Sequence, residues 1–147
     1  MTTKEYLQQI WRIEKKIDRL KRRREDLRAD LYSIGSPSGN MDADRVSTST
    51  SGDSMLRLIA RVDELERDIV SETNYLVAKK KIICDQIEGM PNDRYREILF
   101  DRYVLCWRWE KIAIMTNLDI RWVYRLHGSA LQAFHDQYSP FKASIDL

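Results

Sequence analysis

The stretch "MLRLIARVDELERDIVSETNYLVAKKKIICDQIEGM", residues 55–90, carries the most regular apolar pattern in the sequence. Apolar residues recur in it every seven positions, at Met55, Val62, Ile69, Leu76, Ile83 and Met90. Leu58 and Leu65 add a second stripe, which drifts later in the stretch. A seven-residue apolar repeat is typical of a helix that packs along one seam against another helix. The pattern therefore predicts a long helix, of about 50 Å at 1.5 Å per residue.

A second heptad pattern occupies the first 34 residues. Its apolar positions are Tyr6, Ile10, Ile13, Ile17, Leu20, Leu27, Leu31 and Ile34. The one gap in this stripe is Arg24, where an apolar residue is due. Thr2 or Thr3 can cap the helix, and Glu5 can complete a capping box. Two helices of similar length predict an antiparallel coiled-coil hairpin, and the same heptads also fit self-association between copies of the chain.

Residues 35–54, "GSPSGNMDADRVSTSTSGDS", separate the two heptad stretches and hold almost no apolar side chain. A segment of this composition cannot offset the entropy lost on ordering. We therefore predict a first domain over residues 1–90, a coiled-coil helical hairpin with a disordered loop at 35–54.

Composition limits the class of protein. The 147 residues are one-third charged, yet the formal net charge is only +2, which argues against a polybasic protein. Five glycines, three prolines and the lack of strand-like alternation predict an all-α fold. The apolar runs are too short to cross a membrane, and the N-terminus lacks a signal pattern, so we expect a soluble cytoplasmic protein. Cys84 and Cys106 lack a metal or redox spacing and are expected to be buried free thiols in a reducing compartment.

Positive charge is concentrated in the first helix. Residues 1–34 carry ten Lys or Arg and six Asp or Glu. The run Lys21-Arg22-Arg23-Arg24 could contact phosphate, although the favoured interpretation is the solvated face of a coiled coil.

Residues 91–147 predict a second domain of shorter helices. Pro91 follows the last heptad residue, and Asn92 or Asp93 can cap a new helix over 94–105. A short helix is expected over 110–115, and a last helix over 120–138. Between them "TNLD" forms a turn, in which Asn117 takes a left-handed conformation and Asp119 caps the last helix.

The last helix carries an unusual outer face. Arg121 and Arg125 lie one turn apart, so their guanidinium groups point the same way. Gly128, beside them, would let another backbone approach closely. A helix, a short turn and a second helix with a charged, aromatic outer face are the layout of a DNA-reading helix-turn-helix. The candidate DNA-contacting residues are Arg108, Lys111, Arg121, Trp122, Tyr124, Arg125, His127, Gly128 and Ser129.

Within this set the expected roles differ. Trp122 lies between the inner and outer faces, and His127 is expected to be a polar flank or a phosphate contact. Trp107 and Trp109 are more typical of packing than of base stacking. Neither histidine has a partner at metal-ligand spacing, and no nucleophile motif, phosphate-binding glycine loop or carboxylate pair is present. We therefore expect no catalytic residue, no metal and no cofactor, and hence not an enzyme.

A family resemblance covers about 40 residues. The stretch "RYVLCWRWEKIAIMTNLDIRWVYRLHGSALQAF" resembles the helix-turn-helix of sigma factor region four. It is more closely similar to the RinA/ArpU-like phage and prophage regulators. The residues that carry this likeness are "W-x-x-I-A" at Trp109–Ala113 and "V-Y-R-L-H-G-x-A-L" at Val123–Leu131. Ile114, Met115 and the glycine-free turn depart from the usual pattern.

The resemblance implies roles for single positions. It puts Val123, Leu126 and Ala130 at buried sites, and Arg121, Tyr124 and Arg125 at base-facing sites. Arg108 falls where such modules approach phosphate. The resemblance also implies a DNA-binding transcriptional regulator that can contact RNA polymerase.

We therefore predict a sequence-specific regulator that binds double-stranded DNA, a phage or prophage late-gene activator acting in the bacterial cytoplasm. A homo-oligomer, a dimer or larger, is expected through the N-terminal helices, because one small DNA-reading domain buries little surface. Two alternatives stay open. One is a DNA-packaging recognition subunit of the small-terminase type, and the other is a protein-interaction module that docks on RNA polymerase. The target sequence, the direction of regulation and the oligomer size are not specified by the sequence.

Overall fold

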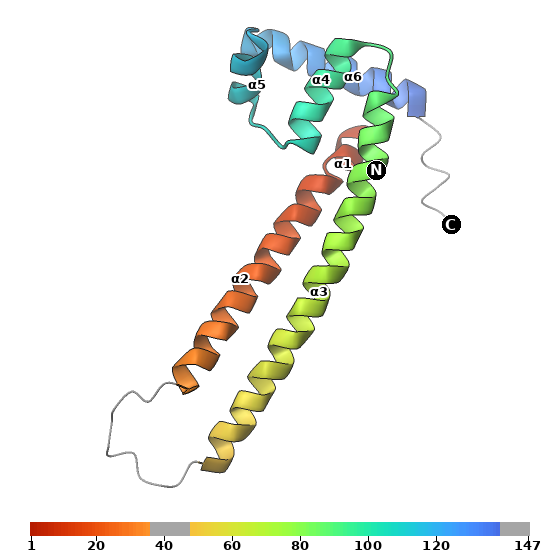
Figure 1. The fold of residues 1–147 in the computed structure, drawn as a ribbon. Coiled ribbons are helices and arrows are strands. Elements are labelled where there is room, and N and C mark those ends of the chain that lie inside the picture. Colours follow the sequence, from red (N-terminus) through yellow and green to blue (C-terminus); the bar gives the residue numbers. More distant parts are fainter. Residues whose placement is uncertain (36–47, 139–147) are drawn as a thin grey trace. The chain divides into compact units, whose positions relative to one another are not determined.

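The computed structural model describes residues 1–35 and 48–138, and most of these residues lie in helices joined by short turns (Figure 1). The elements are α1 (Thr3–Leu7), α2 (Gln9–Gly35), α3 (Thr48–Glu88), α4 (Asp93–Leu99), the π-helical turn η1 (Phe100–Val104), α5 (Trp109–Thr116) and α6 (Ile120–Tyr138). The described residues contain no strand, and the predicted all-α class is confirmed. Among these residues no helix combines the length and the apolar composition that crossing a bilayer requires.

The chain forms two compact units. The terminal unit comprises Met1–Glu14 and the chain from Leu76 onward, and the paired-helix unit comprises Lys15–Tyr75. Because their boundaries fall inside α2 and α3, both long helices contribute residues to both units.

In the paired-helix unit α2 and α3 run antiparallel. Lys16 Nζ forms an ion pair with Glu72, whereas Arg24, two turns further along α2, reaches Glu66, earlier in α3. The heptad residues Ile17, Leu65 and Ile69 are buried along this seam. Arg24, at the gap in the first stripe, is half-buried, with Nη1 3.3 Å from Glu66 Oε2. A long side chain can thus cover apolar neighbours while its charge is paired at the edge of the seam.

α3 begins earlier than predicted, inside the segment predicted to be a loop. α3 begins at Thr48, so residues 48–54, predicted to be disordered, are helical. Residues 36–47 of the predicted loop lie outside the described residues. Extending a helix by one residue is far easier than nucleating it, so a helix held by its seam can continue into polar sequence. An ion pair between Asp53 and Arg57, 3.8 Å apart and one turn removed, lies in this extension.

The N-terminal cap forms as predicted, but the first helix is interrupted. Thr2 Oγ1 accepts a hydrogen bond from Glu5 N at 3.2 Å, and Glu5 Oε2 accepts one from Thr2 N at 2.7 Å. This capping box starts α1, which ends after one turn, and α2 begins at Gln9. Gln8 at this break donates its backbone N–H to Lys4 O.

The terminal unit contains the main hydrophobic core. Its buried residues are Tyr6, Leu7, Ile10, Ile83, Ile87, Met90, Ile98, Leu99, Tyr103, Val104, Ile112, Val123, Ala130 and Phe134. They come from α1, the start of α2, the end of α3 and all later helices, so the core joins segments far apart in sequence. Phe134 of α6 is fully buried, and its ring centroid lies 6.2 Å from that of Tyr6.

The ends of α3 and α6 are tied together. Tyr138 Oη donates to Gln86 O at 2.7 Å, and Gln137 Nε2 donates to Gly89 O at 2.9 Å. Asn92, one of two predicted caps, then starts α4, because its Oδ1 accepts from Arg94 N and Tyr95 N. These bonds satisfy backbone groups that helix ends leave without partners.

The predicted α-helix over 94–105 is replaced after Leu99 by the π-helical turn η1. Leu105 N donates to Phe100 O at 3.0 Å, a bond that spans five residues instead of four. Ile98 and Tyr103 are both buried, and a spacing of five residues points two side chains apart in an α-helix. The wider turn returns Tyr103 to the core side, and Cys106, with φ 57°, reverses the chain after it.

Candidate nucleic-acid interface

The connection between α5 and α6 is a tight turn held by its own backbone. Asn117 adopts φ 55° and ψ 38°, so the predicted left-handed conformation is confirmed. Leu118 N donates to Ala113 O at 3.1 Å, and Asp119 Oδ1 accepts from Arg121 N at 2.8 Å. The turn therefore fixes where α6 begins, at the predicted residue Ile120.

α6 has a clear inner face. Val123, His127, Ala130 and Phe134 are buried, at successive spacings of four, three and four residues. Ile120, Leu126 and Leu131, also expected to pack inward, are half-buried. This spacing keeps one side of a 3.6-residue helix against the core, so the opposite side is left exposed.

Arg121 and Arg125 lie on that exposed side, one turn apart. No ion pair within the described part of the chain includes either guanidinium group. Two adjacent guanidinium groups without a carboxylate partner are able to bind an anionic group.

Aromatic side chains flank the two arginines. Tyr124 is 47% exposed, and its ring meets the half-buried Trp109 edge-to-face with centroids 5.3 Å apart. Such a contact restrains a surface ring without burying it. Trp122, which the sequence placed between the two faces without deciding for either, is exposed.

Gly128 and Ser129 are exposed one turn beyond Arg125. A Cβ atom at Gly128 would meet nothing within 4 Å. Packing among the described residues therefore does not require the glycine, and the open space beside it leaves room for another molecule to approach.

Arg108 and Lys111 lie at the start of α5 and are exposed. Lys111 Nζ is 4.3 Å from the centre of the Trp107 ring, a cation–π contact. Arg102 is placed in a similar way over Trp109, at 4.4 Å, and its Nη1 donates to Trp107 O at 2.9 Å. Both tryptophans are half-buried, in line with the expected packing role, and they hold cations beside the start of α5.

The structure does not support the predicted phosphate contact at His127. Its side chain is buried, its Nε2 lies 2.6 Å from Tyr103 Oη in a hydrogen bond, and its ring packs against Trp109 with centroids 4.5 Å apart. Burial, with smaller effects from Lys4 and Arg102, lowers the pKa of His127 to about 4. The neutral ring is therefore part of the core. The spacing to Val123, Ala130 and Phe134 places His127 on the inner side of α6, but the sequence does not show that Tyr103 supplies the hydrogen bond its burial needs.

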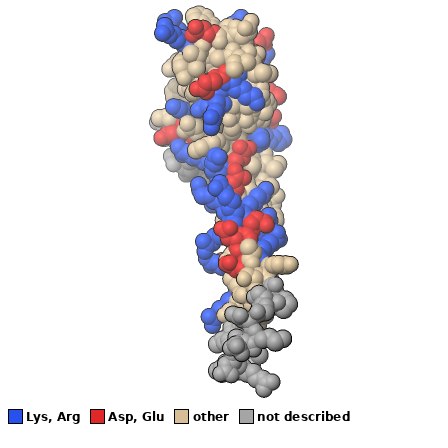
Figure 2. All heavy atoms as spheres, turned by 90° about the vertical axis from the view of Figure 1, so that its left-hand side faces the viewer, with Lys and Arg blue, Asp and Glu red and all other residues tan. Residues whose placement is uncertain are grey.

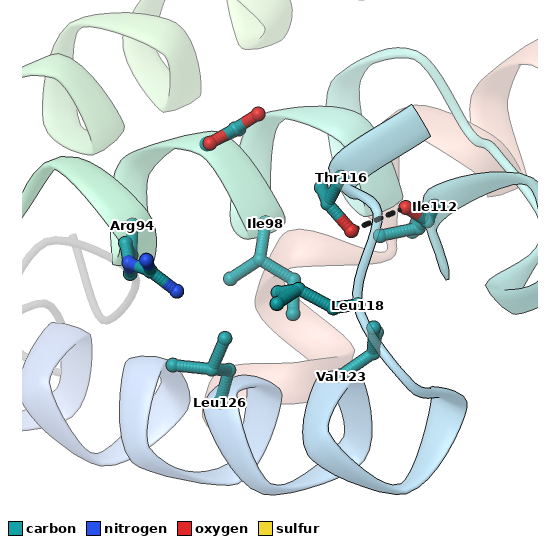
Figure 3. A pocket seen from close by; sticks show the side chains of 8 residues that line it. Arg94, Ile98, Ile112, Thr116, Leu118, Val123 and Leu126 are labelled. Atoms are coloured by element: carbon teal, nitrogen blue, oxygen red, sulfur yellow. Dashed lines mark hydrogen bonds between the residues drawn. The ribbon is translucent and has the colours of Figure 1, made fainter. Parts of the chain in front are cut away.

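A small pocket lies between α4, α5 and α6 (Figure 3). It measures about 170 Å³ and is lined by Arg94, Glu97, Ile98, Ile112, Thr116, Leu118, Val123 and Leu126. Ile98, Leu118 and Leu126 converge on it, whereas Thr116 Oγ1 donates to Ile112 O at 2.6 Å (Figure 3). None of the predicted DNA-contacting residues lines this pocket, which is a gap in helix packing and not part of the surface that holds Arg121 and Arg125.

The side chains of the described residues form no group of three or more potential metal ligands. Cys84 and Cys106 are free and half-buried, less than the predicted full burial. Burial raises the pKa of both thiols, that of Cys106 to about 11 with Glu14 adding to the effect. A thiol with so high a pKa is a weak nucleophile at neutral pH.

The comparisons with protein-family models, curated proteins and solved structures find no match to this chain.

Proposed function

We propose that this protein is a sequence-specific transcriptional regulator that binds double-stranded DNA through α5 and α6, which act as a helix-turn-helix. The observation that carries the proposal is the pair Arg121 and Arg125, exposed one turn apart on the helix after a tight turn. In such domains the second helix enters the major groove, with its N-terminal residues facing base edges.

The surrounding residues receive distinct roles in this proposal. Arg125 or Arg121 contacts a guanine, because a guanidinium group can donate to O6 and N7 together. Tyr124, held by Trp109, faces a base or the sugar beside it. Arg108 and Lys111, at the start of α5, contact phosphates, which position the domain without reading sequence.

The proposal extends to assembly and biological setting. α2 and α3 associate with other copies of the chain, because two linked DNA-reading domains gain effective concentration that one small domain lacks. The setting is a phage or prophage late-gene activator in a bacterial cell, and the protein is not an enzyme.

The experiment compares Arg125→Ala with Arg108→Ala. Each full-length variant is titrated with its best duplex, selected from random DNA, and with single mismatches, at several salt concentrations. Arg125→Ala should weaken the best site by about 1–3 kcal/mol and flatten preference at one or two base positions. Arg108→Ala should weaken all duplexes alike and make the salt dependence shallower by about one unit of slope.

A second candidate function rests on Ile114 and Met115, 77% and 62% exposed on α5. Adjacent exposed apolar side chains fit a protein partner, such as RNA polymerase, better than phosphate.

If Arg121→Ala and Arg125→Ala left DNA affinity and base preference unchanged, the proposed recognition helix would be refuted. Loss of polymerase binding in Ile114→Ser with DNA binding intact would support the second function. Ring-shaped oligomers in mass measurements would instead favour the DNA-packaging alternative.

A further inference from the structure

Residues 15–23 of α2 hold an unusual density of positive charge. The cations are Lys15, Lys16, Arg19, Lys21, Arg22 and Arg23, and the one acidic residue among them is Asp18. All these side chains are exposed. Figure 2, which is viewed from the α2 side, shows basic side chains gathered along the paired helices with acidic ones between them.

The structure divides the cations of α2 into two groups. Those beside α3 are neutralised there, since Lys16 pairs with Glu72, and Arg24 and Arg28 both pair with Glu66. By contrast, the ion pairs found in the described ranges include none with Arg19, Arg22 or Arg23. These three arginines are therefore among the cations of α2 that no described ion pair with α3 compensates.

The three arginines share one face, because positions three and four residues apart are neighbours on a helix. We call Arg19, Arg22 and Arg23 the arginine face. The neighbouring apolar residues Ile17 and Leu20 lie on another side of the helix: Ile17 is buried and Leu20 is half-buried. The face therefore has no apolar stripe to insert into a lipid surface, which a membrane-lying helix requires.

We propose that the arginine face binds the phosphate backbone of duplex DNA, independently of sequence and in addition to α6. Three guanidinium groups lie within about one helical turn, roughly 6 Å of axis, which is a dense array of positive charge for a polyanion to bind. Duplex DNA carries one negative charge per roughly 1.7 Å of axis, and guanidinium groups bind phosphate oxygens in bidentate fashion. The choice of DNA over another polyanion rests on the proposed function.

The test uses the full chain carrying Arg19→Gln, Arg22→Gln and Arg23→Gln together. Its binding to an arbitrary duplex of about 40 base pairs without the selected site is measured by fluorescence anisotropy over a series of salt concentrations. If each arginine neutralises one phosphate, the slope of log K against log[salt] becomes shallower by about 2–3 units, and affinity near 0.1 M salt falls on the order of a hundredfold.

A matched control removes the same charge elsewhere in the paired-helix unit. Arg57, Arg61 and Arg67 of α3 are exposed, and the first two pair with Asp53 and Glu64. The triple glutamine variant at these positions should leave the slope within about one unit of the wild type. Equal weakening by both triple variants would show a general effect of net charge and would overturn the arginine face. Helicity by circular dichroism checks that both variants fold.

Further arms separate this inference from the proposed function. If Arg125→Ala loses base preference while the arginine-face variant binds as tightly as the wild type, the face is refuted and the recognition helix stands. If the arginine-face variant loses binding while Arg121→Ala and Arg125→Ala bind normally, the recognition helix is refuted and the arginine face stands. If the wild type binds no duplex at low salt, both ideas fail. If the arginine-face variant lost binding to polyglutamate but bound duplex DNA like the wild type, the face would be assigned to an acidic protein partner and the DNA proposal would be overturned.

Discussion

The terminal unit and the paired-helix unit bury apolar side chains to different depths. Leu99, Ile112 and Phe134 of the terminal unit are inaccessible to solvent, inside a core built from α1 to α6. In the paired-helix unit Leu65 and Ile69 are buried, but the heptad residue Val62 of the same stripe as Ile69 is only half-buried. The apolar residues of the terminal unit have neighbours on all sides, whereas those of the paired-helix unit are covered only along the seam between α2 and α3.

α3 shows both situations within one heptad pattern. Met55, at the first position of the stripe, is 38% exposed, whereas Ile83, at the same heptad position, is buried. The repeat therefore determines which side of the helix faces a neighbour. How deeply that side is buried depends on how many other elements cover it.

The largest expected effect tests this contrast with one kind of substitution at two places. Leu99→Ala should cost near the upper end of the 2–5 kcal/mol range for buried leucines, because the surrounding core cannot collapse into the cavity. Leu65→Ala should cost near the lower end, since two helices can move together over the gap. Chemical denaturation of both variants gives the difference in unfolding free energy.

Equal losses for Leu65→Ala and Leu99→Ala would break the comparison. They would mean that further helices cover the seam in solution, as the proposed oligomer requires. Measuring the stability of Leu65→Ala at several protein concentrations shows whether the seam lies between copies of the chain. If it does, the unfolding free energy depends on protein concentration; if it does not, the free energy is constant.

The second prediction concerns pH and applies to the terminal unit. The folded pKa of His127 is about 4, below its ordinary value of 6.5. Above pH 6.5 the ring is neutral whether folded or unfolded, and its contribution to stability is complete. As pH falls from 6.5 to 4 the unfolded chain binds a proton that the folded chain excludes, so the unfolding free energy falls. The loss is at most about 3 kcal/mol, and smaller where water reaches the ring.

The control is His127→Gln, which lacks the titrating group and can still hydrogen bond to Tyr103. Unfolding free energies of both proteins are measured at steps between pH 7 and pH 4. The difference between the two curves should change across this window. Parallel curves would show that His127 is accessible to protons in the folded protein.

The smallest expected effect concerns the turn before α6. Asn117 has φ 55°, a conformation that costs an alanine about 1–2 kcal/mol and a glycine much less. Asn117→Ala should therefore lower stability by about 1 kcal/mol, whereas Asn117→Gly should be nearly neutral. Thermal unfolding compares the two, and a loss with glycine as large as with alanine would assign the role of Asn117 to its amide instead of its backbone.

Local signals in the sequence were sufficient for several features. The capping box at Thr2, the left-handed Asn117 and the bounds of α6 depend on residues within a few positions of one another. The exposure of Arg121 and Arg125 follows from the same helical period. Such features are predictable because turn and cap chemistry act over one turn of backbone.

Other features required the tertiary structure. His127 is polar and lies two residues after Arg125, yet Tyr103, 24 positions earlier, offers the hydrogen bond that makes its burial possible. The π-helical turn at Phe100–Val104 depends on which side of this helix faces the core. The ion pair of Arg24 depends on Glu66, which lies in another helix.

The sequence by itself determined the all-α class, the seam positions of the long helices and the two arginines on one face of α6, because each follows from the period of a helix. Only the tertiary structure decided which polar residues turn inward and how deeply each apolar stripe is buried. Those outcomes depend on partners distant in sequence, whose hydrogen bonds and contacts offset the cost of removing a group from water.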